Sequence, residues 1–276
     1  MLLKLSLALM AASMTAFGQQ PNVSAPPTTS TSSAPAAISP KDMNIDQLRA
    51  LAERDEARLK DWAALLRYRS ANAQLPAPVA NEDRVVFMGD SITDNWAKDP
   101  ATFFPGKPYI GRGIGGQITQ QMLLRFWPDV IALHPKVVVL LAGTNDISGH
   151  AGVLTDEAIE ANIMAMTELA SEHGIRVVLS SILPTCEART ESRPIERILA
   201  LNDWLHTYAD AHHFIYVDYY PAMLDDETNE FRRSLTGDCL HPNAEGYKIM
   251  APLAEAGIRA ALAAAQPAAD NHKPRP

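Results

Sequence analysis

Cysteine is scarce in this chain of 276 residues, with only Cys186 and Cys239 present. Two thiols can form at most one bridge, so the chain is not a scaffold held together by several disulfides. The pair leaves two interpretations open. Either both are small buried side chains, or they form one bridge that ties two loops together.

Positive charge is also in short supply, since 24 Lys and Arg face 32 Asp and Glu and the net charge is −8. Nucleic acids and anionic lipid surfaces are bound by clustered Lys and Arg, and no such cluster is visible. The balance therefore argues against a nucleic-acid partner and favours a small or neutral substrate.

A hydrophobic content of 47% is enough for a buried core, so we expect a globular protein.

Long apolar runs are missing except near the start. Residues 1–18 combine Lys4, a mostly apolar stretch and the small-x-small sequence Ala16-Phe17-Gly18, which predicts a secretory signal peptide. The stretch is shorter than the ~20 residues that a membrane-spanning helix needs. No Cys directly follows it to accept a lipid. We therefore expect a secreted or periplasmic protein that starts near Gln19 and has no stable membrane anchor.

Composition divides the remaining chain. Residues 19–42 are rich in Pro, Ser and Thr and predict a disordered linker. Apolar residues then recur at helical spacing from Met43 through Tyr68, which predicts one or two helices in an N-terminal extension over 43–80. The main domain is expected over 81–266, followed by a disordered tail at 267–276.

Within the main domain short apolar runs alternate with helical patterns. Strands are predicted at 84–88, 136–141, 176–183 and 214–217, with a weaker one around Tyr109-Ile110. Helices are predicted at 118–127, 155–173, 195–211 and 244–265. Strands that are apolar on both faces predict an α/β fold with a parallel sheet covered on both sides.

In such sheets ligands bind beyond the carboxyl ends of the strands, so the residues that follow each strand are the informative ones. Three strands lead into polar or glycine-rich loops, and the last one into a long loop. The sequences are Gly89-Asp90-Ser91, Gly113-Ile114-Gly115-Gly116, Gly143-Thr144-Asn145-Asp146 and Asp238-Cys239-Leu240-His241.

These loops contain the groups that nucleophilic catalysis needs. A serine hydroxyl becomes a good nucleophile when a neutral imidazole takes its proton and a carboxylate orients that imidazole. Ser91, His241 and Asp238 supply the three groups, and one turn of loop can join the last two. The oxyanion formed in the reaction also needs NH donors. We expect them from the backbone of Ser91 and Gly116 and from the side chain of Asn145.

Each residue also has an ordinary structural interpretation. Gly-Asp-Ser is a common turn sequence, Asn145 can cap a helix or a turn, and His241 can be an exposed loop histidine. Asp90, Asp146 and Asn95 are expected to support the site or form turns rather than to react. The ordered combination at one edge of the sheet favours the catalytic interpretation.

The combination resembles the GDSL or SGNH hydrolase family over about residues 84–260. The four matching blocks are Val85-Val86-Phe87-Met88-Gly89-Asp90-Ser91, Arg112-Gly113-Ile114-Gly115-Gly116-Gln117, Gly143-Thr144-Asn145-Asp146 and Asp238-Cys239-Leu240-His241-Pro242. Ile92 stands in place of the usual Leu, and Gln117 stands where Asp is frequent. The donor glycine of the second block aligns with Gly116, with Gly115 as the fallback.

The resemblance implies a flavodoxin-like three-layer α/β/α sandwich, with a five-stranded parallel sheet in the order 2-1-3-4-5. It also implies a Ser-His-Asp triad that needs no metal and no organic cofactor. Other folds fit less well. Ser91 lacks the Gly-x-Ser-x-Gly context of the α/β-hydrolase fold, because Thr93 occupies the place of the second glycine. No phosphate-binding glycine motif has the right spacing, and His212-His213 lack a second ligand pair.

We therefore expect a carboxylic ester hydrolase that acts on a small-molecule or glycan ester through an acyl-enzyme. The family contains many carbohydrate esterases, so the resemblance favours short acyl groups on a sugar. An arylesterase, lysophospholipase or thioesterase, and an acyltransferase to a glycan hydroxyl, are alternatives with the same triad. A glycan-binding module without activity is the alternative from another class, but its triad would be expected to have decayed.

Overall fold

The structure is a computed structural model that describes residues 41, 43–150, 152 and 154–264. The predicted signal peptide, nearly all of the predicted linker and the predicted tail lie outside the described residues. The chain divides into two units, residues 1–49 and 50–276. The described part of the first unit is Lys41 with residues 43–49, which include the start of α1 (Ile45–Lys60).

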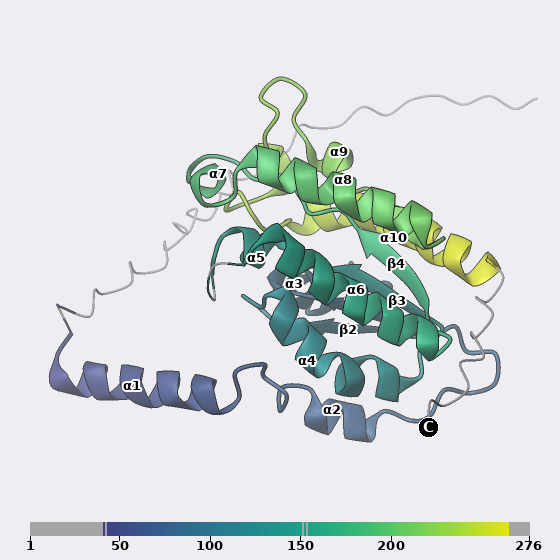
Figure 1. Cartoon of the computed structure of the whole chain (residues 1–276), viewed down its shortest axis with the longest axis horizontal. Helices are drawn as coiled ribbons and strands as arrows, with labels where there is room; N and C mark the ends of the chain where they lie inside the picture. Colours follow the sequence, from purple (N-terminus) through teal and green to yellow (C-terminus); the bar gives the residue numbers. More distant parts are fainter. Residues whose placement is uncertain (1–40, 42, 151, 153, 265–276) are drawn as a thin grey trace, which may run out of the picture. The chain divides into compact units, whose positions relative to one another are not determined.

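Five parallel strands form the sheet, in the order β2-β1-β3-β4-β5. Their bounds are β1 (Val85–Gly89), β2 (Tyr109–Gly113), β3 (Val137–Leu141), β4 (Arg176–Ser180) and β5 (Ile215–Val217). The predicted fold class and strand order are confirmed. Because all five strands run the same way, their carboxyl ends meet at one edge of the sheet (Figure 1).

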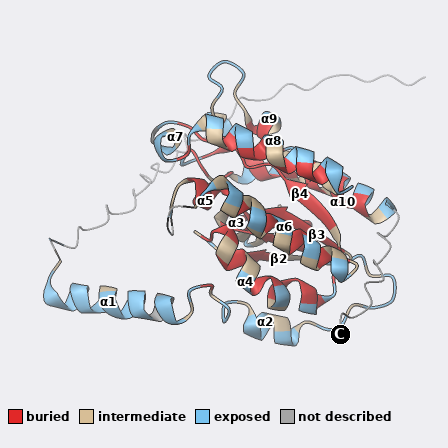
Figure 2. Cartoon of the chain, in the orientation of Figure 1, coloured by how far each residue is buried: buried red, intermediate tan, exposed pale blue. Residues whose placement is uncertain are grey.

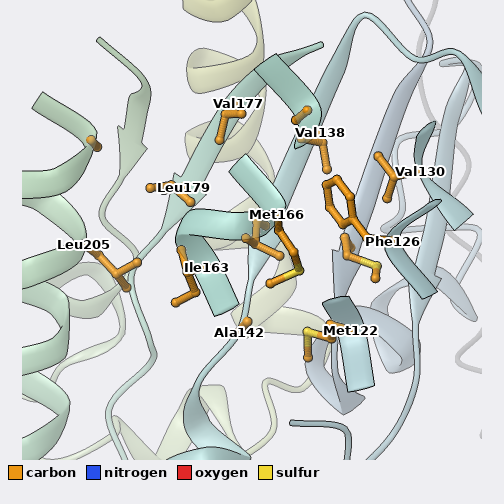
Figure 3. Close-up of a cluster of buried hydrophobic side chains, with 14 of the residues drawn as sticks. Met122, Phe126, Val130, Val138, Ala142, Ile163, Met166, Val177, Leu179 and Leu205 are labelled. Atoms are coloured by element: carbon orange, nitrogen blue, oxygen red, sulfur yellow. The ribbon is translucent and has the colours of Figure 1, made fainter. Parts of the chain in front are cut away.

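Helices cover both faces of the sheet. Side chains alternate along β1, so that Val86 and Met88 point to one core while Val85 and Phe87 point to the other. The first core lies under the helices α4 (Thr119–Asp129), α6 (Asp156–Glu172) and α8 (Ile195–Ala211). The second lies under α3 (Ser91–Ala97) and α10 (Ala244–Ala263). Figure 2 shows the strands buried between exposed outer helix faces, and Figure 3 shows part of the first core.

The long helices agree with the apolar periodicity. Helix α8 has the predicted bounds, and α4, α6 and α10 differ from the predictions by at most two residues at an end. Thr155 caps α6 because its hydroxyl accepts from the backbone NH of Ala158. The helix α2 (Arg69–Gln74) lies within the extension over 43–80, where one or two helices were predicted. The other short elements had no prediction; they are α3, α5 (Thr144–Ile147), α7 (Ala188–Ser192), α9 (Tyr220–Met223) and the 3₁₀ turns Ile131–Leu133 and Arg233–Leu235.

The fourth strand is shorter than predicted. Its apolar run continues to Leu183, but β4 ends at Ser180, and the prediction for 181–183 is wrong. The backbone NH of Ser181 still donates to Val217 of β5, but at Ile182 the side chain of Asn202 replaces a neighbouring strand. Asn202 of α8 accepts from the backbone NH of Ile182 at 2.7 Å and donates to its carbonyl at 3.0 Å. This satisfies a buried peptide outside the sheet, which the apolar pattern does not reveal.

The predicted helical spacing from Met43 through Tyr68 is also partly wrong, because α1 ends at Lys60 and the chain turns through residues 61–68. Asp61 stops the helix. Its carboxylate accepts from the backbone NH groups of Leu65 at 2.7 Å and Leu66 at 3.0 Å, and Ala64 adopts a left-handed φ of 54°.

In the described part of the chain, none of the helices has the length and apolar character needed to cross a bilayer.

Candidate active site

The structure brings Ser91, His241 and Asp238 together at the carboxyl edge of the sheet. Ser91 follows β1 as the first residue of α3, and His241 and Asp238 lie in the loop before α10. The His241 Nε2 atom lies 2.8 Å from the Ser91 Oγ, and its Nδ1 lies 2.7 Å from Asp238 Oδ2. The three groups thus form a continuous hydrogen-bonded relay from a hydroxyl to a carboxylate.

The turn that presents Ser91 is closely packed. An added Cβ at Gly89 would lie 2.2 Å from Thr93 Oγ1 and 2.7 Å from the Leu141 carbonyl, so no side chain fits there. The Asp90 side chain then caps α3 by accepting from the backbone NH of Ile92 at 2.9 Å. The close packing at Gly89 and the cap by Asp90 hold the start of α3, where the Ser91 side chain faces His241.

The Asp238 loop needs no other strand to hold its imidazole. Asp238 Oδ1 accepts from the backbone NH groups of Leu240 at 3.1 Å and His241 at 2.8 Å, while Oδ2 faces the His241 ring. Partial burial acts to raise the pKa of Asp238, but the hydrogen bonds from His241 and Leu240 outweigh it and lower the pKa. The carboxylate is therefore held ionised, and the ring tautomer with a proton on Nδ1 is favoured.

Cys186 and Cys239 form a disulfide with their Cα atoms 4.8 Å apart, so the bridged interpretation holds. The bond joins the segment before α7 to the loop that carries Asp238 and His241. Arg233 and Glu187 form an ion pair between the same two segments. Disulfides persist in oxidising compartments outside the cytoplasm, so the bridge indicates an extracytoplasmic protein.

Asn145 lies close to the triad but in a different loop. It is buried inside α5, and its side chain contacts three other loops. The amide nitrogen donates to the Gln117 carbonyl at 3.1 Å and faces Asp90 Oδ2 at 3.4 Å. The amide oxygen accepts from Arg193 at 3.5 Å. These contacts, rather than a helix cap, fix the orientation of the amide.

The glycines of the second block differ in what they require. Gly116 has φ of +77°, a conformation that favours glycine, and an added Cβ would lie 3.0 Å from His150 Nε2, so the His150 ring would have to shift slightly. At Gly115 an added Cβ would lie 3.8 Å from Ser91 Cβ, which is an ordinary contact. The loop therefore lies against Ser91, and its constrained turn is at Gly116, the residue aligned with the family donor.

Two buried carboxylates support these loops. Burial raises the pKa of Asp90 to about 6, although its hydrogen bond from Ile92 opposes the rise. Burial also raises the pKa of Asp146, whose Oδ1 accepts from Thr119 NH at 2.9 Å and from its hydroxyl at 2.6 Å. Asp90 and Asp146 thus tie together the chain after β1, β2 and β3, as expected of supporting groups.

Two arginines had no sequence-based prediction. The fully buried Arg125 of α4 donates to the carbonyls of Gly89 at 2.9 Å and Arg112 at 2.8 Å, and it pairs with Asp129 at 3.1 Å. Its only sequence signal is a charge on the apolar face of a predicted helix. Arg193 is also buried and donates to the Thr144 carbonyl at 3.1 Å. It lies in a loop where no periodic pattern distinguishes it.

The family of the chain follows from comparison with known proteins. Residues 87–249 match the model of the GDSL-like lipase/acylhydrolase family. The chain belongs to this family. A GDSL-like lipase structure from Bacteroides thetaiotaomicron is 41% identical, with a TM-score of 0.68 over 72% of this chain and 98% of that one. The predicted family is therefore confirmed, and with it a hydrolase of the acylhydrolase type.

Two further matches are more limited. An acetylxylan esterase from Geobacillus stearothermophilus is 18% identical, with a TM-score of 0.55 over 65% of this chain and 95% of that one. The uncharacterized lipoprotein YqeF of Bacillus subtilis (strain 168) is 33% identical over 85 residues. That match covers 28% of this chain and 33% of the lipoprotein.

Proposed function

We propose that the protein is an exported serine esterase that hydrolyses carboxylic esters with short acyl groups, acetylated carbohydrates among them. The observation that carries the proposal is the relay of Ser91, His241 and Asp238, with distances of 2.8 Å and 2.7 Å, in a member of an acylhydrolase family. The acetylxylan esterase of the same fold supports acetylated carbohydrates as the substrate class.

The reaction begins when Ser91 Oγ attacks the ester carbonyl while His241 Nε2 takes its proton. The carbon–oxygen bond to the alcohol then breaks, and His241 gives the proton to the departing oxygen. Water, deprotonated by the same imidazole, attacks the acyl-enzyme and releases the acid and free Ser91. Asp238 keeps the ring oriented and stabilises its positive charge during both steps.

The negative charge on the carbonyl oxygen is stabilised by NH donors from three loops. We assign these to the backbone NH groups of Ser91 and Gly116 and to the side chain of Asn145. Support comes from the contact of the Gly115-Gly116 turn with Ser91 and from the fixed orientation of the Asn145 amide. Both Nδ2 hydrogens of Asn145 already have partners, the Gln117 carbonyl and Asp90 Oδ2, so the oxyanion would accept in place of the longer contact of 3.4 Å to Asp90.

A fluorophosphonate probe tests the nucleophile. It should label the protein once, at Ser91, and Ser91→Ala should abolish both labelling and ester hydrolysis. Ser234→Ala is the matched control, because this exposed serine lies in the neighbouring 3₁₀ turn and outside the relay. Peptide mapping that finds the label on another serine would disprove the assignment.

A substrate panel tests the chemistry. Rates should be highest for acetyl esters and fall as the acyl chain lengthens from acetyl to long-chain p-nitrophenyl esters. Acetylated xylo-oligosaccharides should release acetate. A preference for long chains would instead indicate a lysophospholipase or thioesterase. Transfer of the acetyl group to a hydroxyl of an added acceptor sugar, rather than to water, would indicate an acyltransferase.

A further inference from the structure

A pocket lies beside the loop that contacts Ser91. It has a volume of about 200 Å³, and its lining includes Gly115, Gly116, Gln121, His150, Asp61 and Trp62. Gly115 lies between the pocket and the site. It lines the pocket, and a Cβ added to it would lie 3.8 Å from Ser91 Cβ. A group attached to an ester at Ser91 can therefore reach this pocket.

The wall formed by residues 61–64 is anchored to the second block. Gln121 Nε2 donates to the Trp62 carbonyl at 2.6 Å, and Gln117 Nε2 donates to the Ala63 carbonyl at 2.8 Å. Ala63 is buried beneath them. Both bonds use the backbone of the wall, so they hold its position without engaging the Trp62 side chain. Trp62 lines the pocket and is 40% exposed.

The polar groups of the pocket retain hydrogen-bonding capacity. Each carboxylate oxygen of Asp61 accepts one backbone NH, and each keeps a further lone pair. His150 lines the pocket and is exposed, so its ring nitrogens are accessible to a ligand. An alkyl chain in this pocket would remove these groups from water without replacing their hydrogen bonds, which costs free energy. A ligand with both apolar faces and hydroxyl groups avoids that cost.

We propose that this pocket binds the sugar ring of an acetylated carbohydrate whose acetyl group reacts at Ser91. The flat indole of Trp62 packs against the C–H face of the ring, and Asp61 and His150 hydrogen-bond its hydroxyls. The inference rests on the proposed function, because it assigns the alcohol side of the same ester. It also gives the segment that follows α1 a role in substrate selection.

Selectivity is the measurement that tests the pocket. The kcat/KM ratio of an acetylated xylo-oligosaccharide to p-nitrophenyl acetate should fall about tenfold in Trp62→Ala, mostly through KM. Trp62→Phe should retain much of the ratio, because a phenyl ring also offers a flat face. The control is Trp127→Ala on α4, since Trp127 is 55% exposed and packs against His173 outside the pocket. It should leave the ratio unchanged.

Binding separates the failure of this inference from the failure of the proposed function. In Ser91→Ala, the acetylated oligosaccharide should change the tryptophan fluorescence, and Ser91→Ala with Trp62→Ala should lose that change. Binding without hydrolysis of any ester by the unmodified protein would uphold the pocket and refute the proposed function. Ester hydrolysis with a selectivity ratio that Trp62→Ala leaves unchanged would overturn the pocket. Melting temperatures of all variants identify any that fail to fold.

Discussion

Single side chains at this site each connect several loops. Asn145 is the clearest case, because its amide nitrogen contacts Asp90 and Gln117 while its oxygen contacts Arg193. A residue held in this way can serve the transition state, the fold or both. Kinetics and stability have to be measured together to separate these roles.

For Asn145→Ala we expect kcat to fall about 10²- to 10³-fold with little change in KM, because a donor aimed at the oxyanion acts mainly in the transition state. The matched control is Asn202→Ala, which also removes a buried amide with two hydrogen bonds but lies outside the relay. It should lower the melting temperature without a comparable loss of kcat. An Asn145→Ala protein that melts early but keeps near-normal kcat would show that Asn145 is structural.

Asp90 gives stability a distinct pH dependence. Its pKa is about 6 in the folded protein against an ordinary value of 3.8, so the folded state holds this proton more tightly than the unfolded state. The corresponding stability is present below about pH 4 and is lost as the pH rises through about 6. At about 1.4 kcal/mol for each pKa unit, the loss approaches about 3 kcal/mol.

The Asp90→Asn variant tests this dependence, because the amide oxygen can still accept from Ile92 but does not titrate. Urea unfolding of both proteins between pH 4 and 8 measures the difference in their free energies of unfolding. We expect Asp90→Asn to gain stability relative to the unmodified protein as the pH rises through about 6. Curves that run parallel across this range would contradict the raised pKa.

At the scale of elements, the site is built from loops that are distant in sequence and held by specific links. The disulfide joins the segment before α7 to the loop before α10, and its two cysteines are 53 positions apart in the sequence. Cys239 adopts a left-handed φ of 65° directly after Asp238. The bridge therefore restrains the backbone of the loop that orients His241.

The double variant that combines Cys186→Ser and Cys239→Ser should have a free energy of unfolding about 2–4 kcal/mol lower, because the bridge restricts the unfolded chain. It should also lower kcat, because the Asp238 loop loses its restraint. Urea unfolding and ester kinetics, compared with the protein before and after reduction, measure both effects. An intact mass showing two free thiols in air-oxidised protein would rule out the bridge.

At the scale of the whole molecule, the parallel sheet places four loops at one edge. Ser91, Gly116, Asn145 and His241 come from chain segments that are up to 150 residues apart. They meet because each follows the carboxyl end of a strand or returns to that edge through the last loop. The proposed nucleophile, base and oxyanion donors are thus all groups of this chain.

This organisation predicts catalysis that does not depend on a metal ion. An excess of chelator should leave the rate of p-nitrophenyl acetate hydrolysis unchanged, because the relay of Ser91 and His241 activates the nucleophile by itself. Adding zinc or magnesium after chelation is the control. A rate that falls with chelator and returns with one of these ions would contradict the prediction.

Local patterns in the sequence determined much of this protein. Apolar strands that alternate with helices along the sequence predicted the parallel sheet, because a strand buried on both faces needs apolar residues along its whole length. Helical periodicity predicted the bounds of α8. The motif residues Ser91, Asn145, Asp238 and His241 could also be placed, since each follows a strand or lies in a short loop. These features depend on neighbours in the sequence.

Tertiary structure decided the features that depend on distant neighbours. The end of β4 follows from the side chain of Asn202, and the turn over residues 61–68 is docked by Gln117 and Gln121. The disulfide, the contacts of Arg125 and Arg193 and the pocket beside Trp62 are of the same kind. Each of these features joins residues that only folding brings within hydrogen-bonding or bonding distance. Composition and periodicity describe sequence neighbours, so they cannot identify the distant residue that forms the contact.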